Sequence, residues 1–551
     1  MPEFTLHAVD LVMVGLYVVF IIAVGFYVSK RASTTDDYFL AGRTLTWWLI
    51  GFSLFASNVS SSTLVGLSSS AYSTGIAVYN YEWMAALVLV VFIVFFLPFY
   101  LRSRVFTLPE FLELRFDGRS RYYVSGVMVL MNIAIDTAAA LYAGSLVVQI
   151  LYPELPLWIA VVILGALAGL YTVAGGLKAV VYTDAVQAVL LLLGSLIVAW
   201  LSFEAIGSWS AVTAVVPESD LSLIMPADDP SLPWPGLLTG VFLLGFYFWG
   251  TNQFMVQRML GAKDLNHGRW GALFAGFLKL TVIFIMVLPG IFGRLLYPIE
   301  QYPALVNSDL IFPIMMFDLL PVGIRGLIIA ALVAAIMSSV DSTLNSASTL
   351  VTMDFVKKLR PTIGNRGLVV TGRIVTFVFM ALAIIWAPNI AKFPNLWTYL
   401  QAVLAYLSPP IVACFIVGVF WKRASRNSAF AALIAGHFVA AVVFLAVLSN
   451  RLIVQTGVLS AEQLNLVDSG VPVIHFLYLV PLLLLVSIGA MVITSLYSGK
   501  PDPEQIDQLT WSPEFFRAET AELKELPWYQ NYRILAVGML ILIAVFVGIF
   551  W

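Results

Sequence analysis

Two apolar segments of the chain contain polar residues that could bind an ion. The first, Gly51–Gly66, reads GFSLFASNVSSSTLVG, and its middle, 56–63, is almost all small or hydroxylated. Ser and Asn compete for backbone hydrogen bonds and weaken a helix locally, and free carbonyls at membrane depth are tolerated only where they line a cavity or hold an ion. We therefore predict a broken helix whose carbonyls and hydroxyls bind a small cation. The alternative is close helix packing through small residues.

The second segment, AAIMSSVDSTLNSAS, adds a carboxylate to a similar set of hydroxyls. Ser338, Asp341 and Ser342 are spaced i, i+3, i+4 and share one helix face. Hydroxyls and the carbonyls of a nearby broken helix would supply oxygen ligands, and the carboxylate would offset the charge of a monovalent cation. The alternative is that the hydroxyls bond back to their own helix. Asp341 weighs against it, because a buried carboxylate without a partner is costly.

Four further ionisable residues lie inside apolar segments, where such residues mark ion or substrate paths by default. Glu82 is near the start of its segment, Asp136 is in the middle of MNIAIDTAAA, and Asp184 is near the end that we expect to be cytoplasmic. Lys279, in GFLKLTV, is too deep to reach the membrane surface easily. We therefore expect these side chains to mark the path of an ion or a substrate.

The elements that must position these residues are membrane spans. Of the 551 residues, 61% are hydrophobic and only 11% are charged, and the mean hydropathy is +0.94, which excludes a soluble protein. Apolar runs of ~20 residues, long enough to span a bilayer, recur throughout. We predict an all-α polytopic membrane protein with about 14 spans and a short helical excursion over 299–320. The spans are 8–28, 46–73, 78–100, 122–151, 156–174, 180–203, 234–257, 270–293, 323–355, 369–390, 395–420, 428–449, 472–497 and 532–551.

Basic residues define the orientation. When the loops are assigned alternately to the two sides, all but five of the 29 Lys and Arg residues fall on one side, and the long loop 204–233 on the other side has none. The positive-inside rule places the basic side in the cytoplasm. We therefore predict a multi-pass protein of the plasma membrane (the inner membrane of a bacterium), with both termini extracytoplasmic.

Repeated glycines predict a second interrupted helix. Gly240, Gly245 and Gly250 lie in the seventh span. Two interrupted helices in corresponding positions are typical of transporters built from inverted repeats, with the site at mid-membrane. The predicted organisation is a peripheral N-terminal helix and loop (1–45), a five-helix repeat (46–203), an extracellular loop (204–233), a second five-helix repeat (234–420) and peripheral C-terminal helices (421–551).

Several motifs carry a family resemblance over nearly the whole chain. They are DYFLAGRTLTWW (37–48), SLFASNVSSSTLVG (53–66), YEWM (81–84), TLPEFLELRF (107–116), YTVAGGLKAVVYTDAVQ (171–187), WGTNQFMVQRML (249–260), GFLKL (276–280), SSVDSTLNSAST (338–349) and LSPPI (407–411). The chain resembles the sodium/solute symporters, and within them the bacterial sodium–sugar cotransporters of the sodium/glucose–galactose type. The resemblance implies two inverted five-helix repeats that work by alternating access, with inward sodium movement driving solute uptake.

The resemblance also implies sodium ligands. One site would join the first helix break to the ninth span through the backbone carbonyls of Ala56, Val59 and Ala335 and the hydroxyls of Ser338 and Ser339. A second site would use Asp184, Ser338, Asp341 and Ser342. Asp341 replaces the serine, threonine or alanine usual in the family, so it would strengthen cation binding or carry a proton instead.

The solute pocket implied by the resemblance is rich in polar groups. Positions that match sugar contacts are Asn58, Glu82, Trp249, Lys279 and Gln401. Charged and amide groups bind vicinal hydroxyls through strong hydrogen bonds, and Trp249 offers a face for stacking. Three departures complete the set. Thr63, with Ser62, replaces longer polar residues, Gly245 replaces an asparagine, and Asp136 occupies a position that varies with substrate. The predicted gates are Leu67, Tyr81 and Trp397 outside and Phe248, in place of a tyrosine, inside.

The favoured function is sodium-coupled import of a sugar or polyol. The alternative is import of an amino-bearing solute with Asp136 or Glu82 as counter-ion; an ion pair between Lys279 and either acid would weaken it. A sensor or channel is disfavoured, because no cytoplasmic signalling domain is evident and broken helices that enclose a site do not suit an open pore. No enzyme is expected, because the four histidines are scattered along the sequence. The expected partners are Na+, the solute and lipid, with no nucleic acid.

Overall fold

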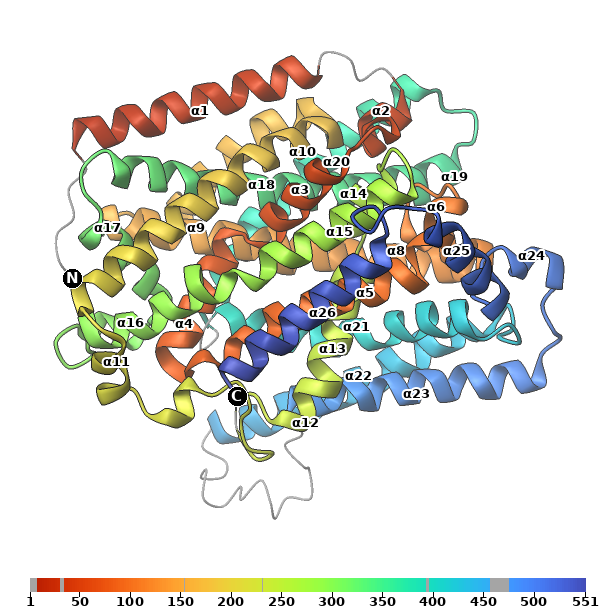
Figure 1. The fold of residues 1–551 in the computed structure, drawn as a ribbon. Helices are drawn as coiled ribbons and strands as arrows, with labels where there is room; N and C mark the ends of the chain where they lie inside the picture. The colour runs from red at the N-terminus through yellow and green to blue at the C-terminus, as the bar shows by residue number, and fades with distance from the viewer. Residues whose placement is uncertain (1–6, 30–33, 153, 230, 393–395, 456–474) are drawn as a thin grey trace.

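The computed structural model describes residues 7–29, 34–152, 154–229, 231–392, 396–455 and 475–551. The described chain is helical almost throughout, and its only strand-like pairings are two isolated bridges. Figure 1 shows the helices packed side by side in one bundle. This confirms the predicted all-helical fold.

The first half of the chain forms the elements α1 Ala8–Ser29, α2 Thr35–Leu40, α3 Trp47–Asn58, α4 Ser61–Thr74, α5 Asn80–Phe95, α6 Leu97–Arg102, α7 Leu108–Arg115, α8 Gly118–Met131, η3 Asn132–Thr137, α9 Ala138–Leu151, α10 Leu157–Ile206, α11 Trp209–Val215, α12 Trp234–Gly236, η5 Leu237–Val241, α13 Phe242–Phe246, η6 Tyr247–Thr251 and α14 Gln253–Leu260. The second half forms α15 Leu265–Leu280, η7 Ile283–Val287, α16 Leu288–Leu296, α17 Ile311–Leu319, α18 Ile324–Leu350, η10 Val351–Val356, α19 Lys357–Leu359, α20 Asn365–Trp386, η11 Ala387–Lys392, α21 Leu396–Phe420, α22 Ser428–Gln455, α23 Phe476–Tyr497, α24 Pro503–Asp507, α25 Pro513–Lys524 and α26 Tyr532–Ile549. Short 3-10 turns join several of them.

Where the structure describes them, the predicted spans coincide with helical residues; positions 395 and 472–474 of two spans lie outside the described residues. Within the described part of the chain, nine helices are long and apolar enough to cross a membrane, or up to ten if the bent pair α3–α4 is one span. The predicted spans 156–174 and 180–203 both fall within α10, where the apolar segments are Leu157–Ala166 and Leu177–Ile206. The expected excursion before the ninth span is also present, as α17 and the short turns that precede it.

The first predicted helix break is confirmed. Helix α3 ends at Asn58, Val59 and Ser60 leave the helical conformation, and α4 continues at an angle of 56°. The Ser60 hydroxyl accepts a hydrogen bond from the backbone N–H of Thr63 at 3.3 Å and so caps α4. The Thr63 hydroxyl donates to the carbonyl of Asn58 at 2.5 Å across the break. Hydroxyl side chains therefore replace the helical hydrogen bonds that the break removes.

The second predicted break is also confirmed, and it lies at Asn252. This residue is extended (φ −77°, ψ 127°) between η6 and α14, and its side chain caps α14 by accepting from the N–H of Phe254 at 3.2 Å. Gly250 lies just before the break. Gly240 has a different role, because a Cβ there would lie 2.4 Å from the carbonyl oxygen of Leu477. That glycine allows α23 to approach closely.

Several π-helical segments interrupt the membrane helices. Segment η3 contains Asp136, and η6 contains Phe248 and Trp249. A π-helical turn inside an α-helix often occurs at a functional site. These interruptions therefore contain three of the residues predicted to bind solute, Asp136, Phe248 and Trp249.

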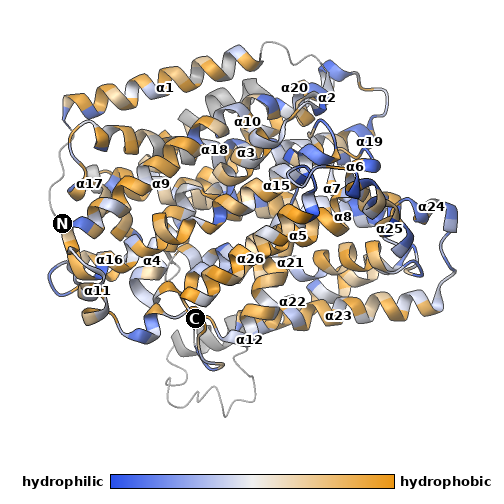
Figure 2. Ribbon diagram, in the orientation of Figure 1, coloured by the Kyte–Doolittle hydropathy of each residue, from blue (hydrophilic) through white to orange (hydrophobic). Residues whose placement is uncertain are grey.

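The two ends of the bundle differ in polarity. Figure 2 shows hydrophilic residues gathered around α2, α6, α19, α24 and α25, whereas α11, α12 and the C-terminal end of α26 lie at the other end. Between the ends, large apolar side chains such as Phe438 (68% exposed) and Leu485 (65% exposed) face outward. An apolar surface of this kind is expected of a protein whose solvent is lipid.

A polar pocket at the helix breaks

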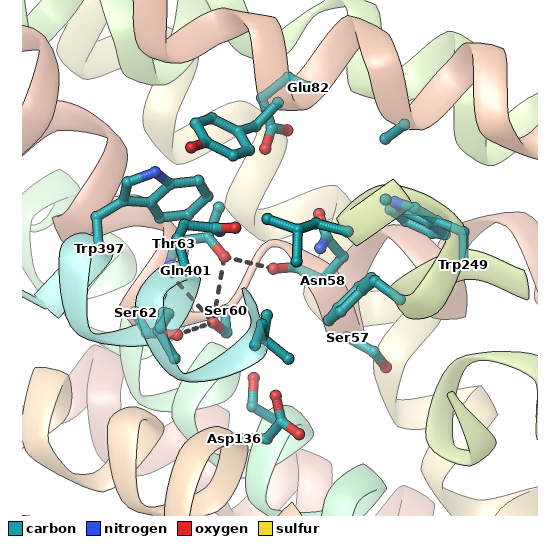
Figure 3. Close-up of a pocket in the computed structure, with 18 of the residues that line it drawn as sticks. Ser57, Asn58, Ser60, Ser62, Thr63, Glu82, Asp136, Trp249, Trp397 and Gln401 are labelled. Carbon is teal, nitrogen blue, oxygen red and sulfur yellow. Dashed lines mark hydrogen bonds between the residues drawn. The ribbon is translucent and has the colours of Figure 1, made fainter. Parts of the chain in front are cut away.

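A pocket lies where the α3–α4 break meets α5, η3, α13, η6, α15, α18 and α21 (Figure 3). Its lining includes all nine residues that the sequence predicts to bind solute. They are Asn58, Thr63, Glu82, Asp136, Gly245, Phe248, Trp249, Lys279 and Gln401. The fold thus brings these residues from eight helical elements to one place, while their contact with a solute remains a prediction.

An ion pair between Lys279 and Glu82 lies on one side of the pocket. The side chains are 1% and 4% exposed, and the ammonium also donates a hydrogen bond to Oδ1 of Asn58. The ring of Trp249 lies 6.0 Å from the Lys279 nitrogen. Two buried opposite charges stabilise each other where a single one would be costly. The ion pair therefore connects α15 with α5, and the hydrogen bond from Lys279 connects α15 with Asn58, the last residue of α3, at the α3–α4 break.

Asp136 lies apart from this pair. Figure 3 shows Glu82 and Asp136 on opposite sides of the pocket. Among the described residues, no hydrogen bond or ion pair reaches the carboxylate of Asp136, although the residue lines the pocket and is half-buried. Of the two acids that the sequence offers as partners of Lys279, the structure selects Glu82.

Aromatic rings lie at the predicted gates. The rings of Tyr81 and Trp397 meet edge to face with centroids 5.3 Å apart, and both line the pocket. Phe248 packs against Trp249 at 5.4 Å and Phe254 at 5.3 Å. Leu67 is fully buried in the core and lies outside the pocket lining. The aromatic members of the gate set therefore border the pocket, whereas Leu67 does not.

The residues of the first predicted sodium site lie on two neighbouring elements. Ala56 and Val59 are at the C-terminal end of α3, and Ala335, Ser338 and Ser339 are on α18, which packs against α3. The last carbonyls of a helix have no intrahelical partner, so the end of α3 offers oxygen ligands. Ser339 also lines the pocket, which would bring a bound cation close to the solute.

The second predicted sodium site surrounds Asp184, a fully buried residue of α10. Its carboxylate accepts hydrogen bonds from Ser53 at 2.5 Å, from Ser57 at 3.2 Å and from Ser338. Asp341 is also fully buried, on the same helix face as Ser338. Oxygen-bearing side chains of α3, α10 and α18 thus meet around Asp184, while cation binding there remains a prediction.

Arg258 is the residue of this cluster that the sequence pattern misses. It lies in α14, just beyond the predicted end of the seventh span, where the sequence predicts a basic residue of a cytoplasmic loop. Its side chain is 1% exposed, and its guanidinium lies 3.3 Å from the Asp184 carboxylate. It also donates to the hydroxyls of Ser53 at 2.7 Å and Ser342 at 2.5 Å, and to Ser57. In this structure, a protein cation therefore neutralises the carboxylate that would hold the second sodium ion.

Comparison with known proteins agrees with this architecture. The model of the sodium:solute symporter family matches residues 38–436. This chain belongs to the sodium:solute symporter family. It is 36% identical to sodium/glucose cotransporter 4 of Danio rerio, over 96% of this chain and 84% of that protein. It is also 36% identical to sodium/myo-inositol cotransporter 2 of Oryctolagus cuniculus (93% and 80%) and to a sodium/mannose cotransporter of Bos taurus (93% and 90%).

Solved structures of other symporters share the fold of this family member. A Na+-coupled sialic acid symporter in a substrate-bound, outward-open state is similar with a TM-score of 0.75 and 24% identity, over 90% of this chain and 99% of that one. Mhp1, a nucleobase-cation-symport-1 family transporter, is similar with a TM-score of 0.53 and 13% identity, over 87% and 99%. The predicted inverted-repeat fold is thus confirmed. The protein is a multi-pass, sodium-coupled symporter of a small polar solute.

Proposed function

We propose that this symporter imports a neutral, hydroxyl-rich solute, a sugar or a polyol, together with Na+. The observation that carries the proposal is the buried Lys279–Glu82 pair with Asn58 in the pocket wall. Such a group offers charged donors and acceptors side by side, which suits vicinal hydroxyls. Trp249 adds an apolar ring face, and Gln401 adds an amide. The relatives support the same class, because their names record transport of glucose, myo-inositol and mannose.

Sodium binding would prepare the pocket for this solute. The ion would bind at the carbonyls of Ala56, Val59 and Ala335 and the hydroxyls of Ser338 and Ser339. Val59 lies at the helix break, so a sodium ion bound to its carbonyl would fix the angle between α3 and α4. The polar side chains at the break, such as Asn58 and Thr63, would then be held in place for the solute. Solute affinity would then rise with sodium concentration, as linkage between two sites requires.

Closure and release would follow at the aromatic gates. Leu67, Tyr81 and Trp397 would close the extracytoplasmic side, and Phe248 would open the path to the cytoplasm. The uneven distribution of Lys and Arg supports a plasma-membrane orientation with both termini extracytoplasmic. Inward movement of each positive charge through ~100 mV would contribute ~2.3 kcal/mol to uptake.

A second cation would bind at Asp184, Ser338, Asp341 and Ser342. This step requires the guanidinium of Arg258 to leave Asp184, because the two now form an ion pair. The cation would be sodium, or a proton carried by Asp341. Movement of Arg258 with α14, the second half of a broken helix, would couple this site to the conformational change.

One observation favours a second candidate, the import of an amino-bearing solute. Glu82 is already neutralised by Lys279, but the carboxylate of Asp136 faces the pocket without a partner among the described residues. It could therefore serve as counter-ion to a ligand ammonium. Import of an amino-bearing solute would depend on Asp136 alone. Import of a sugar or polyol would use several polar groups of the pocket, namely Asn58, Glu82, Lys279 and Gln401.

The test is uptake into proteoliposomes of a labelled panel of hexoses, polyols and amino acids, with and without an inward sodium gradient. We expect a sodium-dependent signal for at least one hexose or polyol. A signal confined to amine-bearing solutes would refute the sugar proposal and leave sodium coupling in place.

A further inference from the structure

We propose that the turn between α19 and α20 binds the headgroup of an anionic phospholipid, whose acyl chains lie along the exposed face of α20. This surface site uses no residue of the polar pocket and none of the predicted cation ligands. The inference therefore goes beyond the proposed function and holds whichever solute is imported.

The charge of this segment suits an anionic partner. Between positions 355 and 386 the chain has no Asp or Glu but five basic residues, Lys357, Lys358, Arg360, Arg366 and Arg373. All of them are exposed, at the hydrophilic end of the bundle (Figure 2). Lys358 pairs with Glu113 at 2.9 Å. No ion pair within the described residues neutralises the other four, and basic clusters of this size beside a membrane helix attract anionic headgroups.

A short turn holds two of these arginines close together. The backbone N–H of Ile363 donates to the carbonyl of Arg360 at 3.1 Å, and α20 begins at Asn365. The side chain of Ile363 packs over Gly367, where an added Cβ would lie 2.7 Å from Cγ1 of Ile363. The turn is therefore folded onto the first turn of α20, with Arg360 before it and Arg366 after it. Guanidinium groups bind phosphate oxygens through paired hydrogen bonds.

The face of α20 that continues from this turn suits acyl chains. Arg366, Val370, Arg373 and Phe377 follow the spacing i, i+4, i+7, i+11 and share one face, and all four are exposed. From Arg366 to Trp386 the helix rises ~30 Å, which is the thickness of the hydrocarbon core. Arg366 therefore lies at headgroup depth. Val370 and Phe377 lie at the depth of the acyl chains, and the long side chain of Arg373 extends back toward the headgroups.

The experiment measures which lipid gathers beside the turn, with the full-length protein in vesicles of phosphatidylglycerol and phosphatidylcholine. Thr362→Cys introduces an exposed thiol between the two arginines for a fluorescent label. The native Cys414 is fully buried, so a polar thiol reagent does not reach it. A small fraction of one lipid or the other carries a nitroxide on its acyl chain, which quenches the label at short range.

We expect phosphatidylglycerol to be enriched over phosphatidylcholine at the label by at least about tenfold relative to the bulk membrane. Equal quenching by the two lipids would overturn the proposal without any further variant. Loss of the enrichment on addition of inorganic phosphate, at an ionic strength matched with chloride, would assign the turn to a free anion and refute the lipid site.

Arg360→Gln with Arg366→Gln, made in the labelled protein, tests the arginines themselves. We expect the enrichment to fall by at least about fivefold. The matched control is Arg426→Gln with Lys500→Gln, which removes two exposed positive charges at the same end of the bundle, where acidic residues follow at positions 502, 504 and 507. The control should leave the enrichment unchanged. Equal losses in the two double variants would show an effect of net charge alone and refute a site at the turn.

Salt provides the same test without the arginine variant, should that variant fail to fold. Screening by potassium chloride weakens attraction between exposed charges, so the enrichment at Thr362→Cys should fall steadily as the salt concentration rises. An enrichment that does not respond to salt would refute the role of the basic residues.

Discussion

The Lys279–Glu82 pair can be tested by separating its contribution to stability from its contribution to solute binding. Lys279→Gln leaves the carboxylate of Glu82 buried without a cation, and Glu82→Gln leaves the ammonium without an anion. Both side chains are at most 4% exposed, so water can do little to replace the lost partner. Removing one member of a buried pair typically costs ~3–5 kcal/mol. We expect each single variant to lower the melting temperature in detergent clearly.

The double variant, Lys279→Gln with Glu82→Gln, removes both charges. We expect it to recover most of the melting temperature, because no uncompensated charge is left and the two amides can bond to each other and to Asn58. Transport should not recover. Each charge-assisted hydrogen bond to a solute hydroxyl is worth ~1.5–3 kcal/mol, so the half-saturation concentration of the solute should stay raised by roughly 10- to 100-fold.

The measurement is therefore a double-mutant cycle in two readouts, melting temperature and sodium-driven uptake. If the double variant were as unstable as the worse single variant, the two charges would not compensate each other. If it transported with wild-type affinity, the pair would be structural only, and the sugar pocket would lose its main support.

Three further predictions concern the cation sites and the cytoplasmic side. Ser339→Ala should raise the sodium concentration for half-maximal uptake while the maximal rate is kept; an unchanged sodium curve would remove Ser339 from the site. Arg258→Gln should strengthen sodium activation, since Asp184 loses its protein counter-charge; a sodium response like that of the wild type would argue against a cation site there. Burial alone would raise the pKa of Glu519 in α25, but Arg269 and the neighbouring donors hold it below its ordinary value of 4.5. The wild type should therefore lose stability as pH falls below that value, and Glu519→Gln, measured by thermal unfolding, should be less stable at neutral pH and respond less to acid.

The sequence by itself determined the class of protein and the place of the site. Apolar runs of membrane length define the spans, and the hydroxyl-rich segment 56–63 locates the first break because such residues are unfavourable in the middle of a lipid-facing helix. Polar residues at membrane depth are rare enough to be noticed one by one. Three residues noticed in this way, Glu82, Asp136 and Lys279, line the observed pocket. The rest of the predicted solute-binding set came from the family resemblance, and those residues line the pocket as well.

The tertiary structure decided which of these groups meet. In the sequence, Glu82 and Asp136 are equivalent candidates for Lys279, and only the packing of α5 against α15 selects Glu82. In the sequence, Arg258 follows a predicted span and resembles an ordinary basic residue of a loop. In the structure, the helix break at Asn252 orients α14 so that the guanidinium of Arg258 contacts Asp184. Helical periodicity predicts which side chains share a face of one helix. Pairing between helices depends on their separation and crossing, which no local pattern encodes.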